Sequence, residues 1–312
     1  MTREPSNVLH GGVATFYGLP HSESDDIEGA RCVLAGVPWD EGNAGRNGAN
    51  YGPRAFRDAS GWFLSYDAQR DFDLWSGLPS VDGGDVRVVP ADAGTTMSNI
   101  AGHVESIRGQ GALPVLIGGN HSITIGATRG AASTLDGSMG YLCIDAHLDT
   151  APELLGAKYS SGCPTYRVCE LDNVSPSNVV VFGVHGWLNP RSQVASANEI
   201  GISWYGMDKI EEHGWRPLLE EALAKVTDGV DGFYVSFDQD SIDASCFPGT
   251  GTPEPAGFEA REACALARRL GEARPVAFDA VELAPVYDPS GISARLSCGL
   301  VLAFLSGWVS RG

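Results

Sequence analysis

Short apolar runs of strand length recur along the chain, and segments with helical spacing lie between them. The strand candidates are 31–38, 86–89, 113–117, 140–144, 178–184, 202–205, 232–237 and 275–281. The helix candidates begin at Pro53 and continue at 96–110, 123–133, 217–226, 259–270 and 292–309. A continuous apolar run is typical of a strand that is buried on both faces. Strands that alternate with helices predict an α/β fold in which helices cover both faces of a parallel sheet.

Length and composition favour one large domain. The chain has 312 residues, of which 43% are hydrophobic, and we find no internal repeat and no linker rich in Pro, Gly or Ser. We therefore predict an N-terminal arm at 1–28 and a single domain at 29–312. The formal net charge is −18, which argues against a nucleic acid or an anionic membrane as partner because like charges repel. The same charge is compatible with a small cationic substrate.

The cysteines and the N-terminus indicate a cytoplasmic protein. Seven cysteines are scattered along the chain without a C-x-x-C pair, which is typical of a reducing compartment. The first residues contain no apolar segment that resembles a signal peptide. We also expect no membrane span, because no apolar run approaches the length of about 20 residues that a bilayer requires.

Polar clusters directly follow four of the predicted strands. These clusters are Asn120 and His121, then Asp145, His147 and Asp149, then Asp238 and Asp240, and finally Glu282. One such cluster alone could be an ordinary polar strand end. Ligands of open parallel sheets bind beyond the carboxyl ends of the strands, however, and all four clusters lie there. If the strand at 140–144 stays extended, Asp145, His147 and Asp149 point to the same side.

The residue types in these clusters predict a site for two metal ions. The candidate ligands are two histidines and four aspartates: His121, His147, Asp145, Asp149, Asp238 and Asp240. Four converging carboxylates repel one another, and two divalent cations balance their charge. Oxygen-rich ligands with imidazoles and no thiolate suit Mn²⁺ better than Zn²⁺. Two such ions about 3.5–4 Å apart can activate a bridging water as a nucleophile at neutral pH.

The motifs around these residues resemble those of the ureohydrolase family, which includes arginase and agmatinase. The three motifs are GGNHS at 118–122, DAHLD at 145–149 and SFDQDSID at 236–243. The segments PGTGTPEP at 248–255, DAVELAP at 279–285 and GVPWDEGNAGRNGANYGPRAFR at 36–57 are similar as well. The resemblance implies a three-layer α/β/α sandwich around an eight-stranded parallel sheet. It also implies two Mn²⁺ per chain, with Ni²⁺ as another possibility, and a homotrimer or homohexamer.

The resemblance further implies a role for each site residue. One metal ion takes His121, Asp145, Asp149 and Asp238, and the other takes Asp145, His147, Asp238 and Asp240. Asp149 also carries protons, and Glu282 binds the guanidinium or amidinium group of the substrate. The implied reaction is hydrolysis of a linear guanidino compound, agmatine or a guanidino acid. Metal-bridged hydroxide attacks the guanidinium carbon, and urea and an amine are released.

Ser161 departs from the pattern of arginases and agmatinases. It stands where these enzymes carry a histidine that is thought to relay protons, and a serine cannot act as an acid or base near neutral pH. Formimidoylglutamases tend to have Ser or Asn there. Two alternatives therefore stay open: a formimidoylglutamase that releases formamide, and a family member without catalytic activity.

The loops that determine substrate specificity are harder to predict from the sequence than the metal ligands. Asn47, Asn50, Ser161 and His185, together with Glu282, are the candidates for contact with the substrate. The sequence shows no basic pair that would mark a site for an α-amino-acid carboxylate. This favours a guanidino amine or a guanidino acid over arginine.

Overall fold

An eight-stranded parallel sheet forms the centre of the protein in a computed structural model, which describes residues 12–22, 27 and 29–310. Its strands are β1 (Cys32–Val37), β4 (Ser80–Asp85), β5 (Leu113–Gly118), β6 (Met139–Ile144), β7 (Val179–Val184), β8 (Ser203–Gly206), β9 (Gly232–Asp238) and β10 (Ala277–Val281). Across the sheet the order is β4-β1-β5-β10-β9-β6-β7-β8. Every neighbouring pair is parallel.

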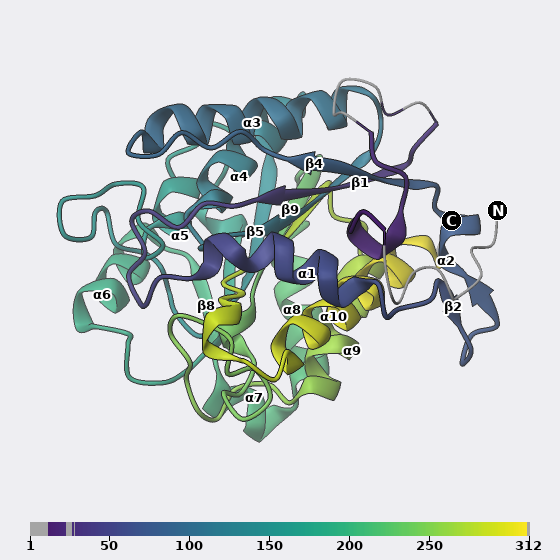
Figure 1. Ribbon diagram of the computed structural model, residues 1–312. Coiled ribbons are helices and arrows are strands. Elements are labelled where there is room, and N and C mark those ends of the chain that lie inside the picture. The colour runs from purple at the N-terminus through teal and green to yellow at the C-terminus, as the bar shows by residue number, and fades with distance from the viewer. Residues whose placement is uncertain (1–11, 23–26, 28, 311–312) are drawn as a thin grey trace.

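Helices cover both faces of this sheet, as Figure 1 shows. On one face lie α1 (Gly52–Ser60), α8 (Trp215–Val226), α9 (Ala260–Glu272) and α10 (Ile292–Val309), whose apolar residues share one core cluster. On the other face lie α3 (Ala93–Gly109), α4 (Ile123–Ser133), α5 (Pro164–Val168) and α6 (Arg191–Ile200). Alternate strand residues contribute to the two clusters, as the pleat of a strand requires. The predicted three-layer sandwich is confirmed.

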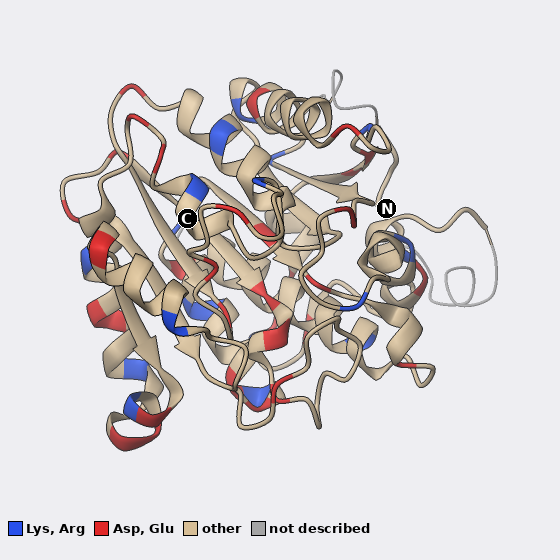
Figure 2. Ribbon diagram, turned by 90° about the vertical axis from the view of Figure 1, so that its left-hand side faces the viewer, with Lys and Arg blue, Asp and Glu red and all other residues tan. Residues whose placement is uncertain are grey.

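Smaller elements complete the architecture. The short helices α2 (Leu74–Gly77) and α7 (Met207–His213) flank the layers, and β2 (Tyr66–Asp67) pairs with β3 (Phe72–Asp73) in a separate antiparallel ribbon. All seven cysteines are free. In Figure 2 the basic residues of the described chain appear as short isolated segments, as expected for a net charge of −18.

The C-terminal helix α10 is an exception to the expectation that no apolar run reaches membrane length. By length and composition it could cross a membrane, but 61% of it is buried inside the domain. Gly271 and Gly307 let it contact α9 closely, since a Cβ at either position would lie 2.0 Å from a backbone oxygen of the facing helix. In this structure α10 is a core helix of the sandwich.

The predicted strand at 86–89 is wrong, and the edge strand is β4 instead. Its sequence, SVDGGD, lacks the apolar run that marks the central strands. The buried Asp82 within it is paired with Arg57 of α1 at 2.9 Å, and Arg57 also contacts Asp85 at 2.6 Å. Ion pairs to a neighbouring helix here replace the apolar contacts that the sequence pattern requires.

The described part of the predicted arm at 1–28 packs against the domain. Phe16 and Tyr17 are buried in the core cluster of α1, where both rings contact Phe56 edge-on. The backbone N–H of Phe16 donates to Asp82 at 2.8 Å. Through Phe16, Tyr17 and Leu19 the segment 12–22 thus shares the core of the main domain. The remainder of the arm, residue 27 excepted, lies outside the described residues.

Candidate metal centre

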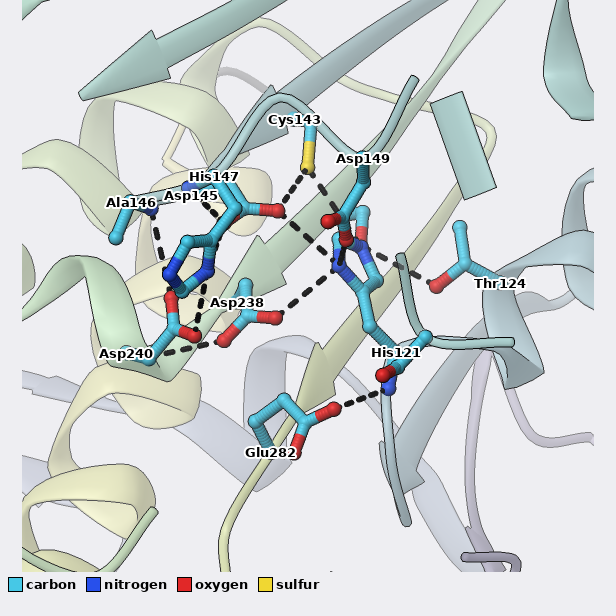
Figure 3. A network of polar contacts seen from close by, with 12 residues as sticks. His121, Thr124, Cys143, Asp145, Ala146, His147, Asp149, Asp238, Asp240 and Glu282 are labelled. Atoms are coloured by element: carbon cyan, nitrogen blue, oxygen red, sulfur yellow. Dashed lines mark hydrogen bonds and ion pairs between the residues drawn. The ribbon is translucent and has the colours of Figure 1, made fainter. Parts of the chain in front are cut away.

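Four adjacent strands in the middle of the sheet deliver the predicted ligands. In the order β5, β10, β9 and β6, they end next to His121, Glu282, Asp238 and Asp145 respectively. Figure 3 shows these side chains pointing toward one another. Residues from 121 to 282 therefore meet because their strands are neighbours in space. The structure brings together all six predicted metal ligands and Glu282.

His121 faces three of the carboxylates. Its Nδ1 lies 3.1 Å from Asp145 Oδ2, 2.9 Å from Asp149 Oδ2 and 3.1 Å from Asp238 Oδ2. This nitrogen is buried and has no hydrogen bond of good geometry. A lone pair that points at three carboxylate oxygens fits a position for a cation between them.

A buried network fixes which ring nitrogen of His121 carries its hydrogen. Ser236 Oγ donates to Asp279 at 2.6 Å, so it accepts from His121 Nε2 at 3.0 Å. Thr124 at 2.7 Å and Tyr234 at 2.6 Å donate to the other oxygen of Asp279. The hydrogen therefore sits on Nε2, and Nδ1 keeps the lone pair that a metal ion needs.

His147 faces the second half of the carboxylate set. Its Nδ1 lies 3.0 Å from Asp240 and 3.5 Å from Asp145 Oδ1, while the other oxygen of Asp145 faces His121. Asp145 thus touches both histidines, as a bridging ligand would. Asp238 Oδ1 accepts the backbone N–H of Asp240 at 2.9 Å, which ties the last residue of β9 to the turn that follows it.

The DAHLD segment reaches this geometry without the extended backbone that the sequence analysis assumed. Strand β6 ends at Ile144, and the chain turns as the N–H of His147 donates to Asp145 Oδ1 at 2.6 Å. Asp149 then adopts a left-handed backbone with a φ of 50°. A non-glycine residue rarely adopts this conformation, and such strain is concentrated at functional sites.

The protein alone concentrates more negative charge here than it can hold in ionised form. Burial, reinforced by the charge of Asp145, raises the pKa of Asp149 to about 6. Burial and the neighbouring Asp240 raise the pKa of Asp238 well above its ordinary range. Burial opposes charging of the two histidines, but the surrounding carboxylates outweigh it and raise the pKa of both His121 and His147. Cations that replace these protons would relieve the repulsion.

The donor set fits two hard divalent cations such as Mn²⁺. It offers carboxylate oxygens and two imidazoles around buried positions. Cys143 lies 3.6 Å from both His121 Nε2 and Asp145 Oδ2, so it is more than a core thiol by position. Burial raises the pKa of its thiol, which keeps the sulfur protonated and unsuited to ligation.

Glu282 lies beside the ligand set with one oxygen free. Its Oε1 accepts the backbone N–H of His121 at 2.7 Å, and its Oε2 is buried with no hydrogen-bond partner. Burial raises the pKa of this carboxyl to about 8. Its backbone is also left-handed, with a φ of 64°. An unpartnered buried carboxylate oxygen calls for a cationic N–H donor.

A cavity of about 300 Å³ opens above the ligands. Its floor consists of His121, His147, Asp149, Asp238, Asp240 and Glu282, and its walls of Ala44, Leu154, Ser161, Gly162, Trp187, Leu188, Pro190, Gln193 and Thr252. None of these lining residues is Lys or Arg. The cavity therefore has an acidic floor and walls that are apolar or neutral.

Ser161 is one of the predicted substrate contacts that does line the cavity. Its Oγ accepts the N–H of Ala44 at 2.8 Å, and its own N–H donates to Gly42 at 3.0 Å. These bonds join the loop at 157–163 to the loop at 40–52. The hydroxyl of Ser161 can therefore still donate a hydrogen bond. Unlike a histidine at this position, it cannot take up and release protons near neutral pH.

Asn47, Asn50 and His185 are not among the lining residues. The imidazole of His185 is held by the carbonyl of Gly183 at 2.7 Å and lies against Gly257, where a Cβ would come within 3.0 Å of its Nε2. The backbone oxygen of Asn47 accepts from Tyr287 at 2.7 Å. This placement does not support their predicted contact with a substrate.

Asn120 has a clear structural role that an aspartate could not fill. Its carbonyl oxygen accepts from the N–H and the hydroxyl of Ser122, and its amide nitrogen donates to the backbone oxygen of Glu41 at 3.1 Å. A carboxylate has no hydrogen to donate. The side chain thereby ties the loop at 40–52 to the start of α4.

Several cavity residues were not predicted from the sequence. Trp187, Leu188 and Gln193 follow β7, and Glu254 lies behind the wall that they form. The segment after the run at 178–184 has the same position as the other clusters, because it directly follows a buried strand at the carboxyl edge of the sheet. The four cavity residues in this segment, Trp187, Leu188, Pro190 and Gln193, carry no ionisable group, however, so they lacked the chemistry that identified the other clusters.

Comparison with known proteins identifies the family. The arginase family model matches residues 30–307. Proclavaminate amidinohydrolase of Streptomyces clavuligerus is 32% identical over 299 residues, which cover 95% of this chain and 94% of the relative. Guanidinobutyrase of Pseudomonas aeruginosa is 32% identical over 309 residues, 96% of this chain and 95% of the relative.

Solved structures agree with this assignment. The structure of proclavaminate amidinohydrolase from Streptomyces clavuligerus superimposes with a TM-score of 0.86 at 31% identity, covering 96% of this chain and 98% of that one. Formimidoylglutamase from Bacillus subtilis has a TM-score of 0.87 over 96% of this chain and 92% of its own, but at 23% identity it shows the fold alone. The resemblance to ureohydrolases is confirmed, and the chain belongs to the arginase family of hydrolases.

Proposed function

We propose that this protein hydrolyses a linear guanidino compound, with release of urea and an amine, when two Mn²⁺ ions are bound. The observation that carries this proposal is the free Oε2 of Glu282, buried at the cavity floor beside the ligand set. A guanidinium group presents N–H donors in one plane, and its positive charge pairs with the negative charge of this carboxylate. Its binding there would place the guanidinium carbon next to the six ligands.

The residues of the chain divide the work as follows. Glu282 orients the planar guanidinium, and the N–H of His121 holds Glu282 in place at 2.7 Å. Two divalent cations held by His121, His147 and the four aspartates would lower the pKa of a water to give a nucleophile at neutral pH, and would offset developing negative charge. Asp149 lines the cavity and lies next to His121, so it could take the proton of the attacking water and pass it to the leaving amine.

The walls argue for a substrate without an α-amino-acid end. The lining holds no Lys or Arg to pair with a carboxylate. The amide nitrogen of Gln193 lies at this wall, and among the described residues no hydrogen bond uses it. It is available to a hydroxyl, carbonyl or carboxylate. Agmatinases and guanidinobutyrase among the relatives agree with a linear guanidino amine or acid.

Ser161 is the observation that favours the alternative, a formimidoylglutamase that releases formamide. It occupies the cavity wall without the acid–base chemistry of histidine. Glu282 would bind an amidinium as well as a guanidinium, so the floor does not distinguish the two reactions. A family member without activity would need neither the six ligands nor Glu282 in this arrangement. The expected homotrimer or homohexamer is a further proposal, which light scattering tests.

The deciding experiment is product analysis with a panel of substrates. Purified protein loaded with Mn²⁺ or Ni²⁺ is incubated with agmatine, 4-guanidinobutyrate, arginine, guanidine or formimidoylglutamate, and urea and formamide are both measured. Urea from one of the first four, absent with Glu282→Gln, supports the proposal. Formamide from the last compound would establish the alternative. Neither product from any compound, with two ions bound, contradicts both.

A further inference from the structure

A second buried glutamate, Glu254, lies behind the cavity wall and next to His147. Glu254 follows β9 and is 6% exposed. Its Oε1 accepts the backbone N–H groups of Trp187 and Leu188, both at 3.2 Å. The same oxygen lies 4.0 Å from Nε2 of His147. One carboxylate thus stands between a candidate metal ligand and the wall of the cavity.

The nitrogen of His147 that faces Glu254 needs a partner. Nε2 of His147 is buried and makes no hydrogen bond with any described residue. Nδ1 of the same ring points at Asp240 and Asp145, where a metal ion would bind, so Nε2 carries the hydrogen. Metal-binding histidines usually donate this second N–H to a carboxylate or a carbonyl. A movement of about 1 Å would bring Glu254 within hydrogen-bond distance.

The loop after β7 is shaped to admit Glu254. Gly186 has a φ of +74°, and a Cβ at this position would lie 2.2 Å from Cδ of Glu254. Only glycine fits there without moving the carboxylate. The turn, the two backbone N–H groups and the carboxylate therefore form one unit beneath Trp187, whose side chain is 96% exposed.

We propose that Glu254 is a positioning residue for the metal centre. It orients His147 through Nε2 and, with the same carboxylate, fixes Trp187 and Leu188 at the cavity wall. This inference rests on the proposed function in one respect, namely that His147 binds a metal ion. It follows that one of the two metal sites is linked to the substrate wall, whereas the site at His121 is supported by Ser236 and Asp279 instead.

The test compares two substitutions that separate the parts of this role. Glu254→Gln keeps an oxygen for the two backbone N–H groups but removes the negative charge that faces His147. Glu254→Ala removes both. Mn²⁺ affinity of the chelator-treated full chain is measured by isothermal titration, with metal content by mass spectrometry. Glu153→Gln, an exposed residue next to the cavity residue Leu154, controls for the general loss of one charge.

We expect the two substitutions to weaken one Mn²⁺ site and leave the other unchanged. The expected loss of affinity is about 10-fold for Glu254→Gln and up to about 100-fold for Glu254→Ala. Only Glu254→Ala should also raise the KM for substrate, because only it releases the wall. Glu153→Gln should match the wild type in both measurements. Gly186→Ala provides a second route, since it displaces the carboxylate without removing it.

The outcomes separate this inference from the proposed function. Two unchanged Mn²⁺ sites in folded Glu254→Gln and Gly186→Ala overturn the inference, even if the wild type releases urea. A selective loss of one site supports it, even if none of the guanidino compounds is a substrate. If the wild type binds fewer than two Mn²⁺, the binuclear mechanism and the inference both fall.

Discussion

The floor and the wall of the cavity are built in different ways. The floor consists of buried polar side chains that follow four adjacent strands, and its two histidines, His121 and His147, each lie within 2.9–3.5 Å of two or more carboxylates. The wall consists of apolar and neutral residues on loops, and two of them, Trp187 and Leu188, are 96% and 54% exposed. Under the proposed function, the floor would fix which bond is attacked. The wall would then determine which molecule is held there, and its residues could change without disturbing the chemistry.

Removal of one of the six predicted metal ligands should produce the largest effect. We expect Asp145→Ala and His121→Ala each to lower kcat by at least about 1,000-fold, because several kcal/mol of charge stabilisation depend on the ions that they hold. Metal content by mass spectrometry should fall in parallel. Turnover near the wild-type rate in either variant would refute the ligand assignment.

Glu282→Gln tests the part of the floor that meets the substrate. We expect kcat/KM to fall by about 100-fold, since charge-assisted hydrogen bonds to the guanidinium are lost. Mn²⁺ content should stay at the wild-type level. Because the buried carboxyl has a pKa of about 8, the variant should also melt at a higher temperature than the wild type at pH 9. A lower melting temperature there would contradict the view that this charge destabilises the fold.

After metal removal, the free energy of unfolding should decrease as pH rises, because the floor contains acidic groups with raised pKa values. The pKa of Glu282 is raised from 4.5 to about 8 and that of Asp149 from 3.8 to about 6, both mainly by burial. A raised pKa means that the folded state holds the proton more tightly, so its stabilising effect is lost as pH rises. The raised pKa values of the two histidines act in the same direction.

The melting temperature of chelator-treated protein should therefore fall between pH 5 and pH 9. Added Mn²⁺ should raise it more at pH 8.5 than at pH 6, because cations then replace the missing protons. Differential scanning calorimetry with and without Mn²⁺ checks both statements. A melting temperature that rises steadily over this range without metal would show that the floor is not the source of the pH dependence.

The wall should give the smallest effects. For Trp187→Ala and Gln193→Ala we expect KM to rise by less than about 10-fold, with kcat unchanged, because these side chains contact only the far end of the substrate. Trp204→Ala is the matched control, since this tryptophan is 39% exposed on β8 and is not a cavity residue. A large loss of kcat in the wall variants would mean that the wall residues also take part in the chemical step.

The same division decides what the sequence could predict. His121, Asp145, Asp238 and Glu282 were identified because each follows a buried strand directly, so local pattern and parallel topology place them together. The edge strand at Ser80–Asp85 was missed because Arg57 from another element satisfies its buried Asp82. The contact of Asn47 and His185 with a substrate stays a prediction, since neither residue is among those that line the cavity.

Loop conformation is the part of the site that the sequence pattern does not predict. His185 follows a strand as His121 does, but its ring contacts the carbonyl of Gly183 and lies close to Gly257, and it is not a lining residue. Glu254 stands in a segment that the sequence analysis quoted, yet its role depends on Gly186 and His147, which lie far from it in sequence. Contacts of this kind leave no periodic pattern to recognise.

The order of the four ligand-bearing strands has a consequence for how the enzyme acquires its metal. Strands β5, β10, β9 and β6 are neighbours in the sheet but are spread over the chain from residue 113 to 281. The chain must close several long loops before His121 meets Asp238, and such non-local contacts form late and slowly. A nascent or truncated chain that ends before β10 lacks a strand between β5 and β9. A metal ion bound at these residues would therefore not nucleate the fold as zinc does in small domains, and we expect metal loading to follow the completion of the sheet.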